Sequence, residues 1–142
     1  MKFLIVDDEL VSRMKMHTIL SSIGECTLAE NGRQALDFFK NAYDNKDSFD
    51  LITLDISMND VTGFDVLSQI RNMESNILDK KKAKVIMVTS HSDTGTIIDS
   101  VTIGCDEYIV KPFNKQTVYD KLKKIGLIKT DDVQLWRYDK II

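Results

Sequence analysis

The sequence contains few residues that could hold a fold together through covalent cross-links or a bound metal. Its 142 residues include two cysteines, one proline, one tryptophan and six glycines. Cys26 and Cys105 have no metal-ligand spacing and lie in apolar stretches, so we expect buried free thiols, which suit a reducing cytosol. A chain of this length buries about two thirds of its unfolded surface, so it can fold as one domain without a disulfide or a metal.

The chain also lacks an excess of basic residues and a long apolar segment. It has 19 Lys and Arg against 22 Asp and Glu, a net charge of -3, which argues against direct nucleic-acid binding. The N-terminal apolar run ends at Asp7 and is too short for a signal sequence or a membrane span. We therefore expect a cytoplasmic protein that is not inserted in a membrane.

Apolar and amphipathic segments alternate along the chain, and no internal repeat is present. Five short apolar runs cover Phe3–Val6, Cys26–Ala29, Leu51–Leu54, Val85–Val88 and Tyr108–Val110. Most of them lack polar alternation, which is typical of strands covered on both faces, as in a parallel sheet.

A longer segment with apolar residues at three- and four-residue spacing follows each of these runs. These segments predict helices around residues 11–19, 35–39, 64–70, 97–102 and 118–125. Five strand–helix units in succession predict an α/β fold. We expect an open, doubly wound parallel sheet with two helices on one face and three on the other.

Three segments lie outside this pattern. The connections Tyr43–Ser48 and Glu74–Lys82 are long and polar, and the lysine run in the second is expected to be solvated. The C-terminal segment 130–142 is rich in apolar residues. We expect it to pack back onto the domain, and a contact with a partner or a second copy is the alternative.

Polar residues gather where the predicted strands end. Asp7 and Asp8 follow the first strand, and Asp55 ends the third. Thr89 follows the fourth strand and Lys111 the fifth. In an open α/β sheet, ligands bind beyond the carboxyl ends of the strands. We therefore expect three carboxylates, one hydroxyl and one ammonium group to converge at that edge.

The expected crowding of carboxylates predicts a bound cation. Carboxylates within a few ångströms repel and raise one another's pKa, and a hard divalent cation relieves this repulsion. Mg²⁺ prefers oxygen ligands, so we expect it on Asp8 and Asp55, with Asp7 acting through water. A backbone carbonyl just after Asp55 could complete the shell. Asp55 can then act as a nucleophile toward phosphorus, while Lys111 and Thr89 bind oxygens of the transferred group.

Each of these residues also has a structural alternative. Asp7–Glu9 could cap a helix, and Asp55 could be a turn residue. Lys111 could be a surface lysine and Thr89 an ordinary strand-end residue. Their joint placement at successive strand ends favours a site. The Lys111–Pro112 bond is a candidate for a cis peptide that directs the lysine over the sheet, with a trans loop proline as the alternative.

These strand ends resemble the receiver domain of response regulators, most closely the single-domain chemotaxis type. The matching segments are Phe3–Glu9, Leu51–Asp55, Gly63, Val85–Ser90, Gly104–Tyr108 and Val110–Phe113. The resemblance implies a receiver domain over residues 1–128, followed by a tail over 129–142. It also implies a flavodoxin-like sheet with strand order 2-1-3-4-5.

The resemblance implies a role for each site residue. The roles are Asp55 as phosphoacceptor, Asp7 and Asp8 as the acidic pair for Mg²⁺, the carbonyl of Ser57 as the third protein ligand, Lys111 as the phosphoryl-binding lysine, and Thr89 and Tyr108 as the switch pair. A receiver of this kind is not an enzyme with a separate substrate, although it catalyses its own phosphorylation and dephosphorylation. Its partners would be a histidine kinase or phosphotransfer domain and a downstream target protein, and the chain would be a monomer or a weak homodimer.

The resemblance also implies how the signal would leave the site. Phosphorylation would reshape the face formed by the fourth helix, fifth strand and fifth helix. The loop after the phosphoacceptor departs from the family, which usually has proline where Asn59 stands and aspartate where Thr62 stands. We expect this loop to be less rigid. Ser57 and His91 occupy the positions that tune dephosphorylation in this family.

Three other functions are alternatives. A flavodoxin-like FMN binder would account for Thr94–Thr96 between a strand and a helix, but not for the acidic cluster. An aspartyl-nucleophile phosphatase carries a second aspartate two residues after the first, where this chain has Ser57. The third alternative is a receiver-like interaction module that works without phosphorylation.

Overall fold

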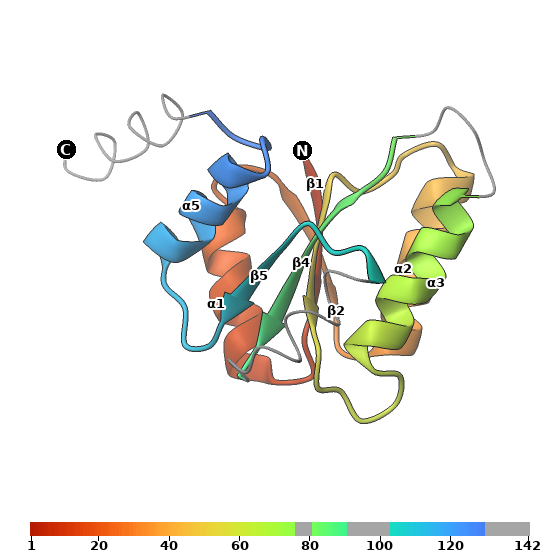
Figure 1. The fold of residues 1–142 in the computed structure, drawn as a ribbon, viewed down its shortest axis with the longest axis horizontal. Helices are drawn as coiled ribbons and strands as arrows, with labels where there is room; N and C mark the ends of the chain where they lie inside the picture. The colour runs from red at the N-terminus through yellow and green to blue at the C-terminus, as the bar shows by residue number, and fades with distance from the viewer. Residues whose placement is uncertain (76–80, 91–102, 130–142) are drawn as a thin grey trace.

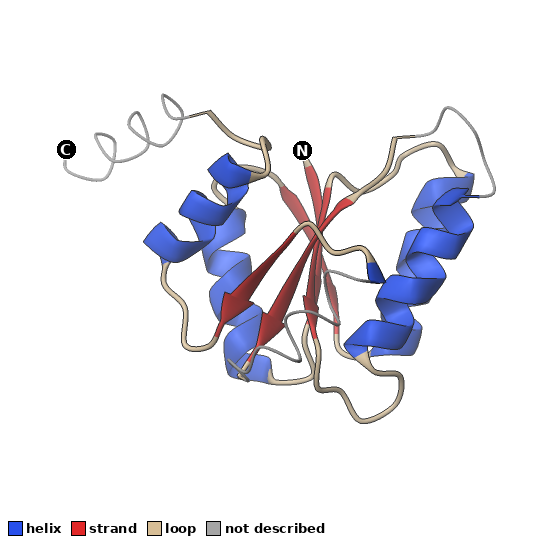
Figure 2. Ribbon diagram, in the orientation of Figure 1, coloured by secondary structure: helices blue, strands red, loops and turns tan. Residues whose placement is uncertain are grey.

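Five parallel strands form one sheet in the structure, a computed structural model that describes residues 1–75, 81–90 and 103–129. The strands are β1 (Lys2–Val6), β2 (Glu25–Ala29), β3 (Leu51–Asp55), β4 (Lys84–Thr89) and β5 (Glu107–Val110). They pair in the order β2-β1-β3-β4-β5, which confirms the predicted doubly wound, flavodoxin-like sheet. Figure 2 shows the strand arrows directed toward the same end of the sheet.

The helices cover both faces of this sheet. They are α1 (Leu10–Leu20), α2 (Gly32–Asp44), α3 (Gly63–Ser75) and α5 (Lys115–Lys124). Figure 1 shows α1 and α5 on one face and α2 and α3 on the other. The predicted helix at 97–102 and the tail at 130–142 lie outside the described residues. Within the described ranges, no helix has the length and hydropathy needed to cross a bilayer.

Alternate residues along the strands supply two hydrophobic cores. On β1, Leu4 and Val6 belong to the core under α2 and α3, whereas Phe3 and Ile5 belong to the core under α1 and α5. Each fully buried side chain of this kind stabilises the fold by about 1.5–3 kcal/mol. Because both faces are covered, the strands appear in the sequence as continuous apolar runs.

Glu74 differs from its prediction. We expected it in a polar loop, but it lies in the last turn of α3 and is buried. Its carboxylate accepts hydrogen bonds from Arg71 at 2.6 Å and from the Ala83 backbone N–H at 2.8 Å. Arg71 also donates to the Gly104 carbonyl and the Asp106 carboxylate. These bonds tie α3 to the segments that precede β4 and β5. The ion pair with Arg71 also compensates for the burial of the Glu74 charge.

The cysteines are also less buried than predicted. Cys26 and Cys105 are both free, as expected, but each is only half-buried. Burial raises the pKa of the Cys105 thiol to about 11, with the charges of Asp106 and Glu107 acting in the same direction. Neither thiol therefore has the lowered pKa of a reactive cysteine.

Candidate functional site

The carboxyl ends of four adjacent strands bring the predicted residues together. Asp7 directly follows β1, and Asp55 is the last residue of β3. Thr89 is the last residue of β4, and Lys111 directly follows β5. Because β1, β3, β4 and β5 are neighbours in this order, their ends lie along one edge of the sheet. This edge is where an open α/β sheet binds its ligands.

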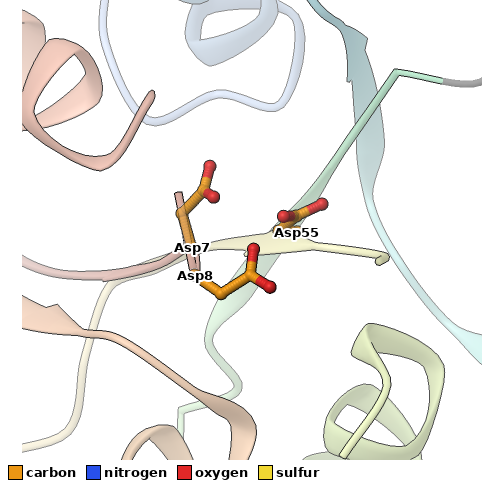
Figure 3. Close-up of side chains that lie close together, drawn as sticks. All are labelled: Asp7, Asp8 and Asp55. Atoms are coloured by element: carbon orange, nitrogen blue, oxygen red, sulfur yellow. The ribbon is translucent and has the colours of Figure 1, made fainter. Parts of the chain in front are cut away.

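Three carboxylates form the centre of the site. Asp7, Asp8 and Asp55 each offer one oxygen, and these oxygens lie within 4.8 Å of one another. Asp7 and Asp55 are buried, at 5% and 4% exposure, whereas Asp8 is exposed. Figure 3 shows the carboxylate of Asp8 directed toward that of Asp55, with Asp7 alongside. A set of carboxylate oxygens with one side open to water fits a hard divalent cation such as Mg²⁺.

Lys111 lies against the two buried carboxylates. Its Nζ is 3.1 Å from Oδ2 of Asp7 and 3.6 Å from Oδ2 of Asp55. Its backbone N–H donates to the Thr89 carbonyl at 2.7 Å, and the Lys111–Pro112 peptide is cis. Burial alone would lower the pKa of Lys111, but the charges of Asp55 and Asp7 raise it overall. The lysine therefore stays charged beside the predicted phosphoacceptor.

Asp55 is in an unfavourable environment for a bare carboxylate. Burial, and next the negative charge of Asp7, raise its pKa from 3.8 to about 7. Lys111 and the Ser57 backbone N–H act in the opposite direction but only partly offset the rise. Such a shift favours binding of a cation or loss of charge at this position.

The turn after β1 is held by Arg13, a residue that the sequence analysis did not single out. The buried guanidinium of Arg13 donates to the Asp7 carbonyl at 2.8 Å. The Asp7 carboxylate in turn accepts the Glu9 backbone N–H at 2.9 Å. Glu9 occupies the N-cap position of α1, but its side chain makes no capping hydrogen bond. Helix capping by the Glu9 side chain therefore does not explain the run of acidic residues Asp7–Glu9. In the sequence, an arginine in the first turns of a predicted amphipathic helix only weakly indicates a contact with the turn before that helix.

The segment between β3 and α3, residues 56–62, is here named the phosphoacceptor loop. The Ser57 N–H donates to Oδ1 of Asp55 at 3.2 Å, and the Gly63 N–H donates to the Ile56 carbonyl at 3.0 Å. A Cβ at Gly63 would lie 2.3 Å from the Asp55 carbonyl oxygen, so only glycine fits there. Thr62 accepts the Asp65 N–H at 3.2 Å and thus bonds the first turn of α3 at the position where the family usually has aspartate.

Thr89 and Tyr108 lie on the same face of the sheet. In the register of β4 and β5, Thr89 pairs with Val110 and Met87 pairs with Tyr108. Thr89 and Tyr108 are therefore diagonal neighbours, two residues apart along their strands. Thr89 is buried and Tyr108 is half-buried. His91, which with Ser57 occupies a position that tunes dephosphorylation in this family, lies outside the described residues.

Tyr108 also contacts α5 through Lys121. The Lys121 ammonium lies 4.9 Å from the centre of the Tyr108 ring and 3.4 Å from the carboxylate of Glu107. Lys124 pairs with the same carboxylate at 2.9 Å. Burial alone would raise the pKa of Glu107, but the Tyr108 N–H and these two lysines lower it overall. A charged cluster thus joins β5 to α5.

Comparison with known proteins agrees with this geometry. The sequence profile of the response regulator receiver domain matches residues 3–123. This chain belongs to the response regulator receiver family. The resemblance inferred from the strand-end motifs is thereby confirmed, and the chain is a receiver domain of the type found in two-component systems.

The individual relatives include chemotaxis regulators and larger signalling proteins. The chain is 32% identical to chemotaxis protein CheY of Bacillus subtilis over 125 residues, 87% of this chain and 95% of that protein. It is 30% identical over 120 residues to hybrid signal transduction histidine kinase I of Dictyostelium discoideum, 84% of this chain and 7% of that protein. The chain thus spans nearly all of the first relative but only a small part of the second.

A solved structure gives the same result for the fold. The CheX-CheY-BeF3-Mg+2 complex from Borrelia burgdorferi matches with a TM-score of 0.76 and 29% identity, over 90% of each chain. The order of the strands and their connections is therefore that of CheY-like receivers.

Proposed function

We propose that this receiver accepts a phosphoryl group on Asp55 from a histidine kinase or a phosphotransfer domain. The observation that carries the proposal is the position of Lys111, whose ammonium group lies 3.1 Å from Asp7 and 3.6 Å from Asp55. An ammonium group at this distance can bind an oxygen of a phosphoryl group on Asp55. Lys111 also borders an open pocket of about 440 Å³, through which a donor can approach.

Mg²⁺ is the proposed cofactor, held by the carboxylates of Asp7, Asp8 and Asp55 and by the carbonyl of Ser57. The proximity of the three carboxylates supports this assignment. When bound, the ion supplies positive charge that offsets the phosphoryl oxygens. The exposure of Asp8 leaves room for the water ligands that Mg²⁺ retains.

The transfer is an in-line displacement at phosphorus. An oxygen of Asp55 forms the new bond to phosphorus while the bond from phosphorus to the donor's imidazole nitrogen breaks. The electron pair of the broken bond returns to that nitrogen, which takes up a proton from solvent. Lys111 and the Thr89 hydroxyl bind phosphoryl oxygens, and this positioning of charge accounts for most of the catalysis.

The signal would then pass from Thr89 to Tyr108. A phosphoryl group on Asp55 attracts the Thr89 hydroxyl, and its movement leaves space into which the Tyr108 ring can turn. The diagonal placement of these residues on one face of the sheet supports the coupling. The surface that changes would include β5, α5 and the helix that the sequence predicts at residues 97–102, and a downstream target protein would bind one of its two shapes.

A protein phosphodonor suits the surface beside the site. Leu10, Val11 and Met14 on α1 are exposed apolar side chains, at 60%, 74% and 42% exposure. Apolar residues grouped at a polar site are typical of protein contacts. We further propose a receiver domain over residues 1–128 with a separate tail over 129–142, a cytoplasmic location, and a monomer or weak homodimer without direct nucleic-acid binding.

Incubation with Mg²⁺ and a small phosphodonor such as acetyl phosphate, followed by intact mass spectrometry, tests the proposal. The wild-type protein should gain one phosphoryl group, Asp55→Asn should gain none, and Lys111→Ala should gain little. Lys40→Ala, an exposed lysine on α2, is the matched control and should behave as wild type. A wild-type protein that stays unmodified while a known receiver is labelled would instead favour the interaction module that works without phosphorylation.

A further inference from the structure

The side chain of Asp60 attaches the phosphoacceptor loop to α2. Oδ1 of Asp60 accepts the Gly32 backbone N–H, and Oδ2 accepts the Arg33 backbone N–H, each at 3.1 Å. Asp60 follows Gly32 by 28 residues in the sequence and Arg33 by 27. A carboxylate that accepts two N–H groups fixes both the distance and the orientation of the loop relative to the helix.

The packing around Gly32 shows how closely the loop approaches α2. A Cβ at Gly32 would lie 2.8 Å from the Val61 carbonyl oxygen and 2.8 Å from the Val61 Cβ. Gly32 is buried, and Val61 is the residue next to Asp60. The backbone of the loop therefore rests directly on the first turn of the helix, and the Asp60 contact holds it there.

Asp60 differs from the other cap of the same helix. Asn31, the N-cap residue, accepts the Gln34 N–H at 2.8 Å within the helix's own first turn. The hydrogen bond of Asn31 therefore lies within α2, whereas those of Asp60 link the helix to the loop. Hydrogen bonds from the Val61 N–H, and from those of Arg33 and Gly32, lower the pKa of Asp60, so the link persists at neutral pH.

We propose that Asp60 is a positioning residue for the phosphoacceptor site, because its attachment to α2 holds the loop that carries Ser57 and adjoins Asp55. The inference rests on the proposed function, in which Ser57 and Asp55 bind Mg²⁺. Asn59 stands where the family usually has a proline, so the backbone here lacks the restraint that a proline ring supplies. The restraint comes instead from the two hydrogen bonds of Asp60.

The test compares Asp60→Ala with Asn31→Ala. Both variants remove a side-chain cap from the same turn of α2, so both should lower Tm by similar amounts. Only Asp60→Ala releases the loop. We expect its Mg²⁺ dissociation constant, measured by titration calorimetry, to rise about tenfold, the lower end of the effect of other residues that support metal ligands. Asn31→Ala should stay within about twofold of wild type, and Asp60→Asn, which keeps one acceptor oxygen, should fall between Asp60→Ala and wild type.

The outcomes separate this inference from the proposed function. Equal Mg²⁺ affinities for Asp60→Ala and Asn31→Ala would overturn the positioning role, because helix capping would then explain the effect of both changes. An Asp60→Ala variant that matches wild type would overturn it as well. A wild-type protein that binds no Mg²⁺ would instead contradict the proposed function itself.

Discussion

Replacing Asp55 by asparagine should stabilise the protein when no metal is bound. The carboxylates of Asp7, Asp8 and Asp55 lie within 4.8 Å of one another, and Lys111 offsets only part of their charge. At an effective dielectric constant of about 20, two like charges at about this distance repel by about 3.5 kcal/mol. Asparagine has nearly the same shape as aspartate and keeps an oxygen for the Ser57 N–H. The change therefore removes the repulsion with little loss of packing.

The electrostatic environment of Asp55 sets the size and the pH dependence of this gain. Raising its pKa from 3.8 to about 7 costs the folded protein about 4 kcal/mol once the carboxyl is ionised. Because asparagine also weakens the contact with Lys111, we expect a gain of about 2–4 kcal/mol in the free energy of unfolding near pH 8. The folded-state pKa lies above the unfolded value, so the gain shrinks as the pH falls below about 7 and vanishes near pH 4.

Urea unfolding of wild type and Asp55→Asn in EDTA, at about pH 8 and about pH 4, measures this difference. Mg²⁺ at about 100 times its dissociation constant should add about 2.7 kcal/mol to the wild-type stability, and less to that of the variant. Asp37→Asn, an exposed aspartate on α2, is the control and should change the stability by less than about 0.5 kcal/mol. An Asp55→Asn protein less stable than wild type in EDTA near pH 8 would refute the reasoning.

Two further predictions concern charged residues away from Asp55. Arg71→Met should lower the free energy of unfolding by about 3 kcal/mol in a urea titration, because it leaves the buried Glu74 carboxylate without its ion pair; Arg33→Met, at an exposed position, should change it little. The lowered pKa of Glu107 means that its contribution to stability is complete above about pH 4.5 and is lost as the pH falls through the folded-state pKa. Glu107→Gln should therefore flatten the acid side of the stability profile, and an unchanged profile would contradict the role of its two lysine partners.

The class of the fold and the centre of the site could be predicted from the sequence alone. Run length and apolar period are local properties, so they were enough to predict the five strands and the four helices that lie within the described residues. The site residues Asp55, Thr89 and Lys111 follow from the same pattern. In a parallel sheet, every residue at a strand's carboxyl end lies at the same edge, whichever strand it follows.

Tertiary structure alone decided the partners of several charged side chains. Arg13 donates to the Asp7 carbonyl, Asp60 attaches its loop to α2, and Glu74 is buried beside Arg71. Charged side chains ordinarily face solvent, yet Arg13 and Glu74 are buried, and the exposed Asp60 bonds backbone N–H groups of another segment. Their partners are brought close by packing between segments far apart in the chain, or by the spacing of residues along a helix. Local periodicity contains no information about such distances, because it reports which face a residue occupies and not what lies opposite that face.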